Sequence, residues 1–151
     1  MKPLSQRQFL HTLGPVVQAA LPAQLQSIQI EPQNWLLKLH FGEKRLHYEV
    51  SRVRARPAWE LGLHFEARDK RLNRFLLLGM RRHLFEIKDE LGGQVVAEMW
   101  DRGWTKVYEL VPEDTLTPAY QTAVAERLAR FITCVHPIFV ALRQDVRTVY
   151  R

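Results

Sequence analysis

Large apolar side chains occupy every second position between residues 59 and 65, namely Trp59, Leu61, Leu63 and Phe65. Successive side chains of a β-strand point to opposite faces of a sheet, so this spacing predicts a strand with one apolar and one polar face. Residues 35–41 and 46–51 repeat the pattern. The chain is therefore predicted to build an antiparallel sheet that is covered by helices on one side only.

The segments before and after these strands have helical or turn signals. Residues 9–21 have helical spacing, although Gly14-Pro15 is expected to break or kink that helix. Residues 25–31 predict one more strand. Asp69 is a suitable N-cap for one long helix that continues to about Leu91.

The C-terminal third predicts a hairpin and a final helix. Asp101-Arg102-Gly103 is typical of a tight turn between strands at residues 95–100 and 104–111. Thr117-Pro118 has the order of an N-cap followed by the first helical residue, and Pro137 is expected to kink the helix that follows.

Together these segments run helix, four strands, helix, two strands, helix. Their short connections favour hairpins, so we predict a single α+β domain over residues 1–151, with a mostly antiparallel sheet and helices packed on one side. This order resembles that of type III secretion chaperones and their relatives, which run helix, three strands, helix, two strands, helix. The resemblance is one of architecture and implies no function.

Composition limits the compartment and the chemistry. The 151 residues are 46% hydrophobic, which is enough for the core of one domain. Cys134 is the only cysteine, so neither an internal disulfide nor a cysteine-based zinc site can form, and a reducing compartment is expected. No apolar run is long enough to cross a membrane. We therefore expect a soluble cytoplasmic protein without a membrane partner.

Charge is distributed unevenly along the chain. The net charge is +6; residues 44–88 contain twelve Lys or Arg against five Asp or Glu, whereas residues 89–118 contain two against seven. Such a basic middle favours anionic partners. The candidate residues for nucleic-acid or other polyanion binding are Arg52, Arg54, Arg56, Arg68, Lys70, Arg71 and Arg74. Because Arg52, Arg54 and Arg56 alternate, we expect them to point one way in an extended segment.

Histidine and glutamate recur on the polar side of the predicted strands. If Glu43-Lys44 is a two-residue turn, paired residue numbers sum to 87, which places His40 opposite His47. His64 joins them only if its strand lies beside this hairpin. Imidazole and carboxylate are ligands of zinc and iron, so the candidate metal ligands are His40, His47, Glu49, His64 and Glu66. A solvated polar face with cross-strand pairs is the simpler interpretation.

Aromatic residues surround the Asp101-Arg102-Gly103 turn. Trp, Tyr and Arg dominate the energetic centres of protein interfaces, so the predicted partner-binding residues are Trp100, Arg102, Trp104 and Tyr108. Packing against the last helix would explain the same residues.

The sequence contains no glycine-rich phosphate loop, no His-Glu-x-x-His and no Gly-x-Ser-x-Gly. We therefore favour a non-enzymatic domain that binds a protein partner or itself, and we predict no cofactor. Two alternatives stay open: binding of nucleic acid or another polyanion through residues 52–74, and a metal-dependent hydrolase at the His/Glu sheet face.

Overall fold

The computed structural model describes residues 2–149, with side chains described through residue 146. Six strands form one antiparallel sheet in the spatial order β1-β2-β3-β4-β6-β5. The strands are β1 (Gln29–Pro32), β2 (Leu36–His40), β3 (Leu46–Arg52), β4 (Ala58–Phe65), β5 (Val96–Asp101) and β6 (Trp104–Pro112). The predicted α+β class with an antiparallel sheet is confirmed.

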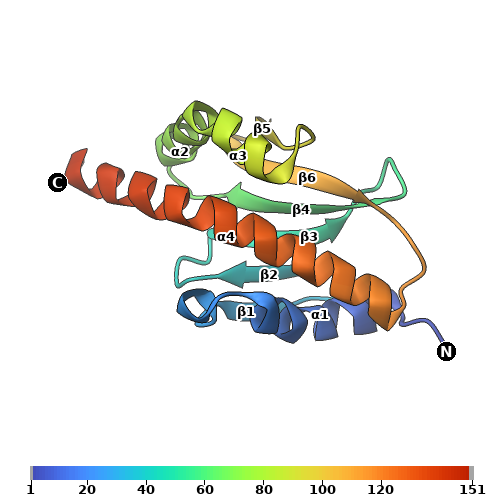
Figure 1. Ribbon diagram of the computed structural model, residues 1–151. Coiled ribbons are helices and arrows are strands. Elements are labelled where there is room, and N and C mark those ends of the chain that lie inside the picture. The colour runs from blue at the N-terminus through green and yellow to red at the C-terminus, as the bar shows by residue number, and fades with distance from the viewer. Residues whose placement is uncertain (1, 150–151) are drawn as a thin grey trace.

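Four α-helices lie on the same side of this sheet, and α4 crosses in front of the central strands (Figure 1). They are α1 (Gln6–Ala20), α2 (Lys70–Arg82), α3 (Leu84–Leu91) and α4 (Pro118–Val149), and a short 3-10 helix, Ala23–Leu25, follows α1. The core fills the space between helices and sheet. Phe9 of α1, Trp59 and Leu61 of β4, and Phe131 of α4 are all buried there. The apolar side of the alternating pattern is thus the side that faces the helices.

One helix prediction needs correction. The helix predicted over residues 69–91 divides at His83, which ends α2 and precedes α3, and this turn keeps Ile87 and Leu91 buried. Pro15 does not break α1, and α4 likewise remains one helix on both sides of Pro137. At the preceding Gly14, a Cβ would overlap the side chain of Ile30, so glycine allows α1 to pack closely on β1.

The N-cap residues of α2 and α4 are the ones predicted from the sequence. Asp69 accepts the backbone N–H of Arg71 at the start of α2, and Thr117 Oγ1 accepts the N–H of Tyr120 at the start of α4. The first strand begins later than predicted, at Gln29, because residues before it form the 3-10 helix and a turn.

The β5–β6 hairpin has a tighter turn than the three residues predicted. Asp101 pairs with Trp104, and the two residues between them, Arg102 and Gly103, both have positive φ angles of 46° and 85°. A two-residue turn in which both φ angles are positive has a backbone twist that matches the right-handed twist of the flanking strands. The register shifts between Met99 and Asp101, so Trp100 occupies a bulge.

Within residues 2–149, no helix has both the length and the apolar character that a membrane crossing requires.

Candidate functional site on the open face of the sheet

The face of the sheet opposite the helices carries most of the candidate site residues, and we call it the open face. Figure 1 shows this face behind the strands, with every α-helix on the other side. α4 therefore covers the apolar face, and it does not cover the His/Glu face. Alternation along the strands places these side chains on the open face: Lys38 and His40 of β2, His47 and Glu49 of β3, Glu60 and His64 of β4, and Lys106 and Tyr108 of β6.

The strand register brings two histidines together. Lys38 pairs with Glu49, which is the register predicted for the β2–β3 hairpin, and β4 lies beside β3 so that His47 pairs with His64. The two imidazole rings are stacked, with centroids 5.5 Å apart. Both histidines are at most 2% exposed, although no helix within residues 2–149 covers them. Neighbouring side chains of the open face thus exclude water from this pair.

Three glutamates surround the two imidazoles. His47 Nε2 lies 3.0 Å from Glu49 Oε1 and 3.9 Å from Glu66 Oε2. His64 Nδ1 lies 3.0 Å from Glu66 Oε2, and its Nε2 lies 2.9 Å from Glu60 Oε2 and 3.8 Å from Glu49 Oε2. We call these five residues, His47, Glu49, Glu60, His64 and Glu66, the His/Glu cluster.

Sequence reasoning did not select Glu60. It lies four residues before His64 on the same strand and face, so the period of two that selected His64 could also have found it. Lys106 was also not selected as a site residue. Its ammonium donates to Glu60 Oε1 at 2.6 Å from the neighbouring strand β6, a contact that depends on the strand order.

The cluster changes the acidity of its members. Burial by itself lowers the pKa of His64, but hydrogen bonds to Glu60 and Glu66 and the charge of Glu49 raise that pKa to about 9. Burial opposes ionisation of Glu60, yet its hydrogen bonds to His64 and Lys106 lower its pKa. The pKa of Glu49 is also lowered, because the hydrogen bond with His47 and the charge of His64 outweigh its burial. The cluster therefore favours a charged His64 imidazolium next to the ionised carboxylates of Glu49 and Glu60.

His40 does not belong to this cluster, although the sequence placed it opposite His47. Its Nδ1 accepts the backbone N–H of Gly42 at 3.0 Å. Its Nε2 lies 3.3 Å from Glu31 Oε2, in a geometry that forms no hydrogen bond. His40 is the last residue of β2, where the chain turns at Gly42 with a φ of 116°, and the imidazole follows the turn toward β1. The other four predicted metal ligands, His47, Glu49, His64 and Glu66, do converge.

The aromatic residues of the β5–β6 hairpin lie next to the cluster. Trp100 meets the edge of His64 at 5.7 Å between ring centroids and packs on Trp104 at 5.4 Å. Lys106 Nζ lies 5.0 Å from the Trp100 ring and 4.4 Å from the Tyr108 ring. These side chains pack on the open face, so the alternative of packing against the last helix is wrong. Two sites that the sequence suggested separately form one continuous surface.

Two hollows adjoin this surface. One has a volume of about 460 Å³, and its lining includes His47, Glu66, Lys44, Arg45 and Trp104. The other, of about 520 Å³, is lined in part by Glu60, Lys106 and Tyr108. The cluster can therefore be reached from solvent at its edges although its centre is buried.

The predicted basic surface divides into two separate groups. Arg52 ends β3, and Arg54 and Arg56 lie in the β3–β4 loop before β4, whereas Arg68, Lys70, Arg71 and Arg74 follow β4 at the start of α2. The eight-residue strand between them spans about 25 Å, at about 3.3 Å per residue. A small-molecule ligand therefore cannot contact both groups at once.

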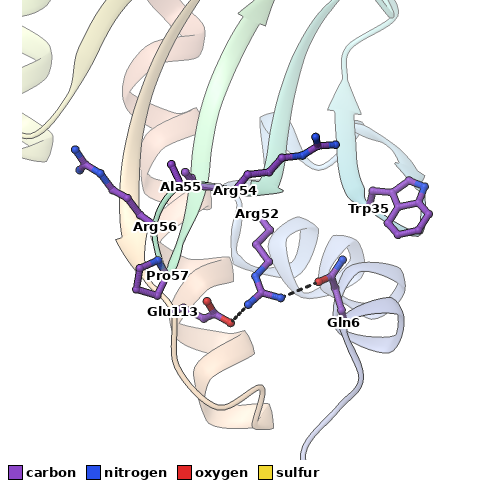
Figure 2. A pocket seen from close by; sticks show the side chains of 9 residues that line it. Gln6, Trp35, Arg52, Arg54, Ala55, Arg56, Pro57 and Glu113 are labelled. Carbon is purple, nitrogen blue, oxygen red and sulfur yellow. Dashed lines mark hydrogen bonds and ion pairs between the residues drawn. The ribbon is translucent and has the colours of Figure 1, made fainter.

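The three arginines that precede β4 also do not point one way, because the chain bends after Val53 instead of continuing as a strand. Figure 2 shows Arg52 directed toward Glu113 and Gln6, Arg54 extending to the side of Trp35, and Arg56 extending to the other side. Arg52 donates to Glu113 at 2.6 Å. Together these side chains line a hollow of about 640 Å³.

Comparison with protein-family models, with curated proteins and with solved structures finds no similar protein.

Proposed function

We propose that this domain binds a protein partner, either another protein or a second copy of itself, on the open face of its sheet. The observation that carries the proposal is the position of Trp100, which is 40% exposed on that face while it packs on Trp104. Large aromatic side chains that are already held in one orientation lose little entropy on binding.

The surroundings of Trp100 support this assignment. Arg102 is exposed at the tip of the same hairpin, and Lys106 is held between the Trp100 and Tyr108 rings. Tyr108 donates its hydroxyl to Glu98 at 2.6 Å, which fixes its ring. Trp, Tyr and Arg are enriched at the centres of protein interfaces, and polar residues form the rim around such centres.

The test is photo-cross-linking of the full chain in its native cells. A photoreactive residue at Arg102 should give a specific adduct, and mass spectrometry would identify either another protein or a second copy of this chain. The control position is Phe85, which is 90% exposed on α3, on the helix side of the sheet. Adducts of equal yield from both positions, or none from Arg102, would contradict the proposal.

Binding measured with the cross-linked partner then separates the two exposed tryptophans. Trp100→Ala should weaken binding by about 2 kcal/mol, which is roughly 30-fold. Trp35→Ala is the matched control, because Trp35 is 74% exposed but lies on the β1–β2 turn beside the arginine-lined hollow. Equal losses in the two variants would indicate general damage instead of a specific contact.

A second candidate function is polyanion binding at the β3–β4 loop. Arg54 and Arg56 are exposed and form no ion pair with any residue in the described part of the chain. Trp35 lines the same hollow and offers a ring on which a base could stack (Figure 2). This candidate retains only part of the basic surface that the sequence suggested.

Anisotropy of a labelled single-stranded oligonucleotide at several salt concentrations tests the second candidate. Replacing Arg54 and Arg56 together by alanine should reduce the slope of log affinity against log salt by about 1.4, because each contact to a single strand contributes about 0.7. The double variant Arg71→Ala, Arg74→Ala is the control at the other end of β4. An equal effect of both pairs, or no binding at low salt, would remove this candidate.

A further inference from the structure

Four residues of the His/Glu cluster, His47, Glu49, His64 and Glu66, form its centre. In each of the two histidines, one ring nitrogen contacts an acceptor that does not belong to these four residues. His47 Nδ1 lies 2.9 Å from the carbonyl oxygen of Lys44, an acceptor, so this nitrogen carries a hydrogen. His64 Nε2 lies 2.9 Å from Glu60 Oε2, which is also an acceptor. Histidines that bind metals are held in this way, by a carbonyl or carboxylate on the nitrogen that does not bind the metal.

The other nitrogen of each ring faces a carboxylate. His47 Nε2 is 3.0 Å from Glu49 Oε1, and His64 Nδ1 is 3.0 Å from Glu66 Oε2. A lone pair on nitrogen repels a carboxylate oxygen at this distance, so a proton or a metal cation must lie between them. One ligand atom from each of these four residues lies within 4.8 Å of the others. Ligand atoms around a tetrahedral zinc ion are about 3.3 Å apart, so small side-chain shifts suffice.

We propose that His47, Glu49, His64 and Glu66 bind one divalent transition-metal ion of the zinc type, with Glu60 and the Lys44 carbonyl orienting the two imidazoles. Two neutral imidazoles and two carboxylates form a ligand set for Zn²⁺, Fe²⁺ or Mn²⁺, whereas Mg²⁺ prefers oxygen ligands and water. The two carboxylates balance the charge of the ion, and Glu60 keeps Lys106 as its own counter-ion at 2.6 Å.

The ion has a route to this group of ligands. His47 and Glu66 line the hollow of about 460 Å³ at the edge of the open face. Glu66 lies just after the end of β4, and its side chain is 14% exposed. The site can therefore load without unfolding of the sheet.

Calorimetric titration of the full chain, freed of metal by a chelator, tests the proposal with Zn²⁺ as the probe. The wild type should bind one Zn²⁺ per chain, and the same concentration of Mg²⁺ should give no binding. His47→Gln and His64→Gln should each weaken Zn²⁺ binding by about 100-fold or more, since the loss of an outer partner alone costs about 10-fold to 100-fold.

His40→Gln is the matched control. His40 lies on the same face with the same 1% exposure as His47, but it points toward Glu31. This variant should bind Zn²⁺ as the wild type does. Thermal melting of the metal-free variants checks their folding, and Glu66→Gln at the strand end replaces any histidine variant that is unfolded. No one-to-one binding by the wild type, undiminished binding in folded cluster variants, or an equal loss in His40→Gln would overturn the proposal.

Discussion

His47 and His64 stand directly opposite each other on β3 and β4, with stacked rings whose centroids are 5.5 Å apart. Two imidazoles in such contact are destabilising when both are charged, unless anions compensate them. Glu49, Glu60 and Glu66 supply this compensation at hydrogen-bond distance. The pair is therefore the centre of the polar network on the open face.

Glu60 should act as a positioning residue for His64. Glu60→Gln removes one of the two hydrogen-bonded carboxylates that raise the pKa of His64, so NMR titration of the metal-free variant should give a pKa below the wild-type value of about 9. Zn²⁺ affinity should fall about 10-fold. Glu98→Gln is the control, because Glu98 bonds to Tyr108 on the same face. An unchanged His64 pKa in Glu60→Gln would contradict this role.

The stability of the metal-free protein should depend on pH through His64. Its pKa is higher in the folded protein, about 9 against 6.5, so its contribution is complete below pH 6.5 and disappears as the pH rises through 9. The contribution is on the order of 3 kcal/mol, at about 1.4 kcal/mol per pKa unit. Urea unfolding with a chelator present should show the wild type losing stability relative to His64→Gln over this range. A difference that stays constant with pH would contradict the prediction.

Tyr48 and His136 form a buried hydrogen bond between β3 and α4. Burial raises the pKa of Tyr48 and lowers the pKa of His136, so both groups are neutral, and a hydrogen bond of 3.0 Å joins the Tyr48 hydroxyl and His136 Nδ1. Tyr48→Phe should lower the free energy of unfolding by about 1–2 kcal/mol, because it leaves the buried Nδ1 atom of His136 without its hydrogen-bond partner. Tyr120→Phe should cost less, since the bond from Tyr120 to the Pro112 carbonyl is exposed to water. Urea unfolding compares the two variants.

Arg127 and Glu109 form an ion pair between α4 and the helix side of β6. The Glu109 side chain is fully buried, and Arg127 reaches both of its carboxylate oxygens as well as the Leu91 carbonyl. Arg127→Leu should lower the free energy of unfolding by about 3 kcal/mol, because a buried carboxylate loses its counter-ion. Arg130→Leu removes an exposed pair with Glu90 and should cost less than about 1 kcal/mol. Similar melting temperatures for both variants would contradict the argument.

The parts of the fold that follow from local patterning could be predicted from the sequence. Alternation in residues 46–51 and 59–65 identified the strands and their buried sides, and the short β2–β3 connection set the pairing of Lys38 with Glu49. The strand order could not be predicted, because β6 lies between β4 and β5 after a connection that contains two helices. The break at His83 lets α3 pack against α4, a tertiary contact that the apolar spacing does not encode.

Part of the candidate site could also be predicted from the sequence. His47, His64, Glu49 and Glu66 share a face by the period of two, so their convergence required only that β4 lie beside β3. His40 was predicted to be a further ligand, but its ring contacts the turn at Gly42 at the end of the strand instead of the cluster. The basic residues were grouped by closeness in sequence, and the length of β4 separates them in space.

The central claim is that His47 and His64 bind the same metal ion. X-ray absorption fine structure of the zinc-loaded wild-type chain tests it most directly. Outer-shell scattering should show two imidazole ligands at about 2.0 Å, together with carboxylate oxygens. A zinc environment with one imidazole or none would contradict the claim that the two strands present their histidines to a single ion.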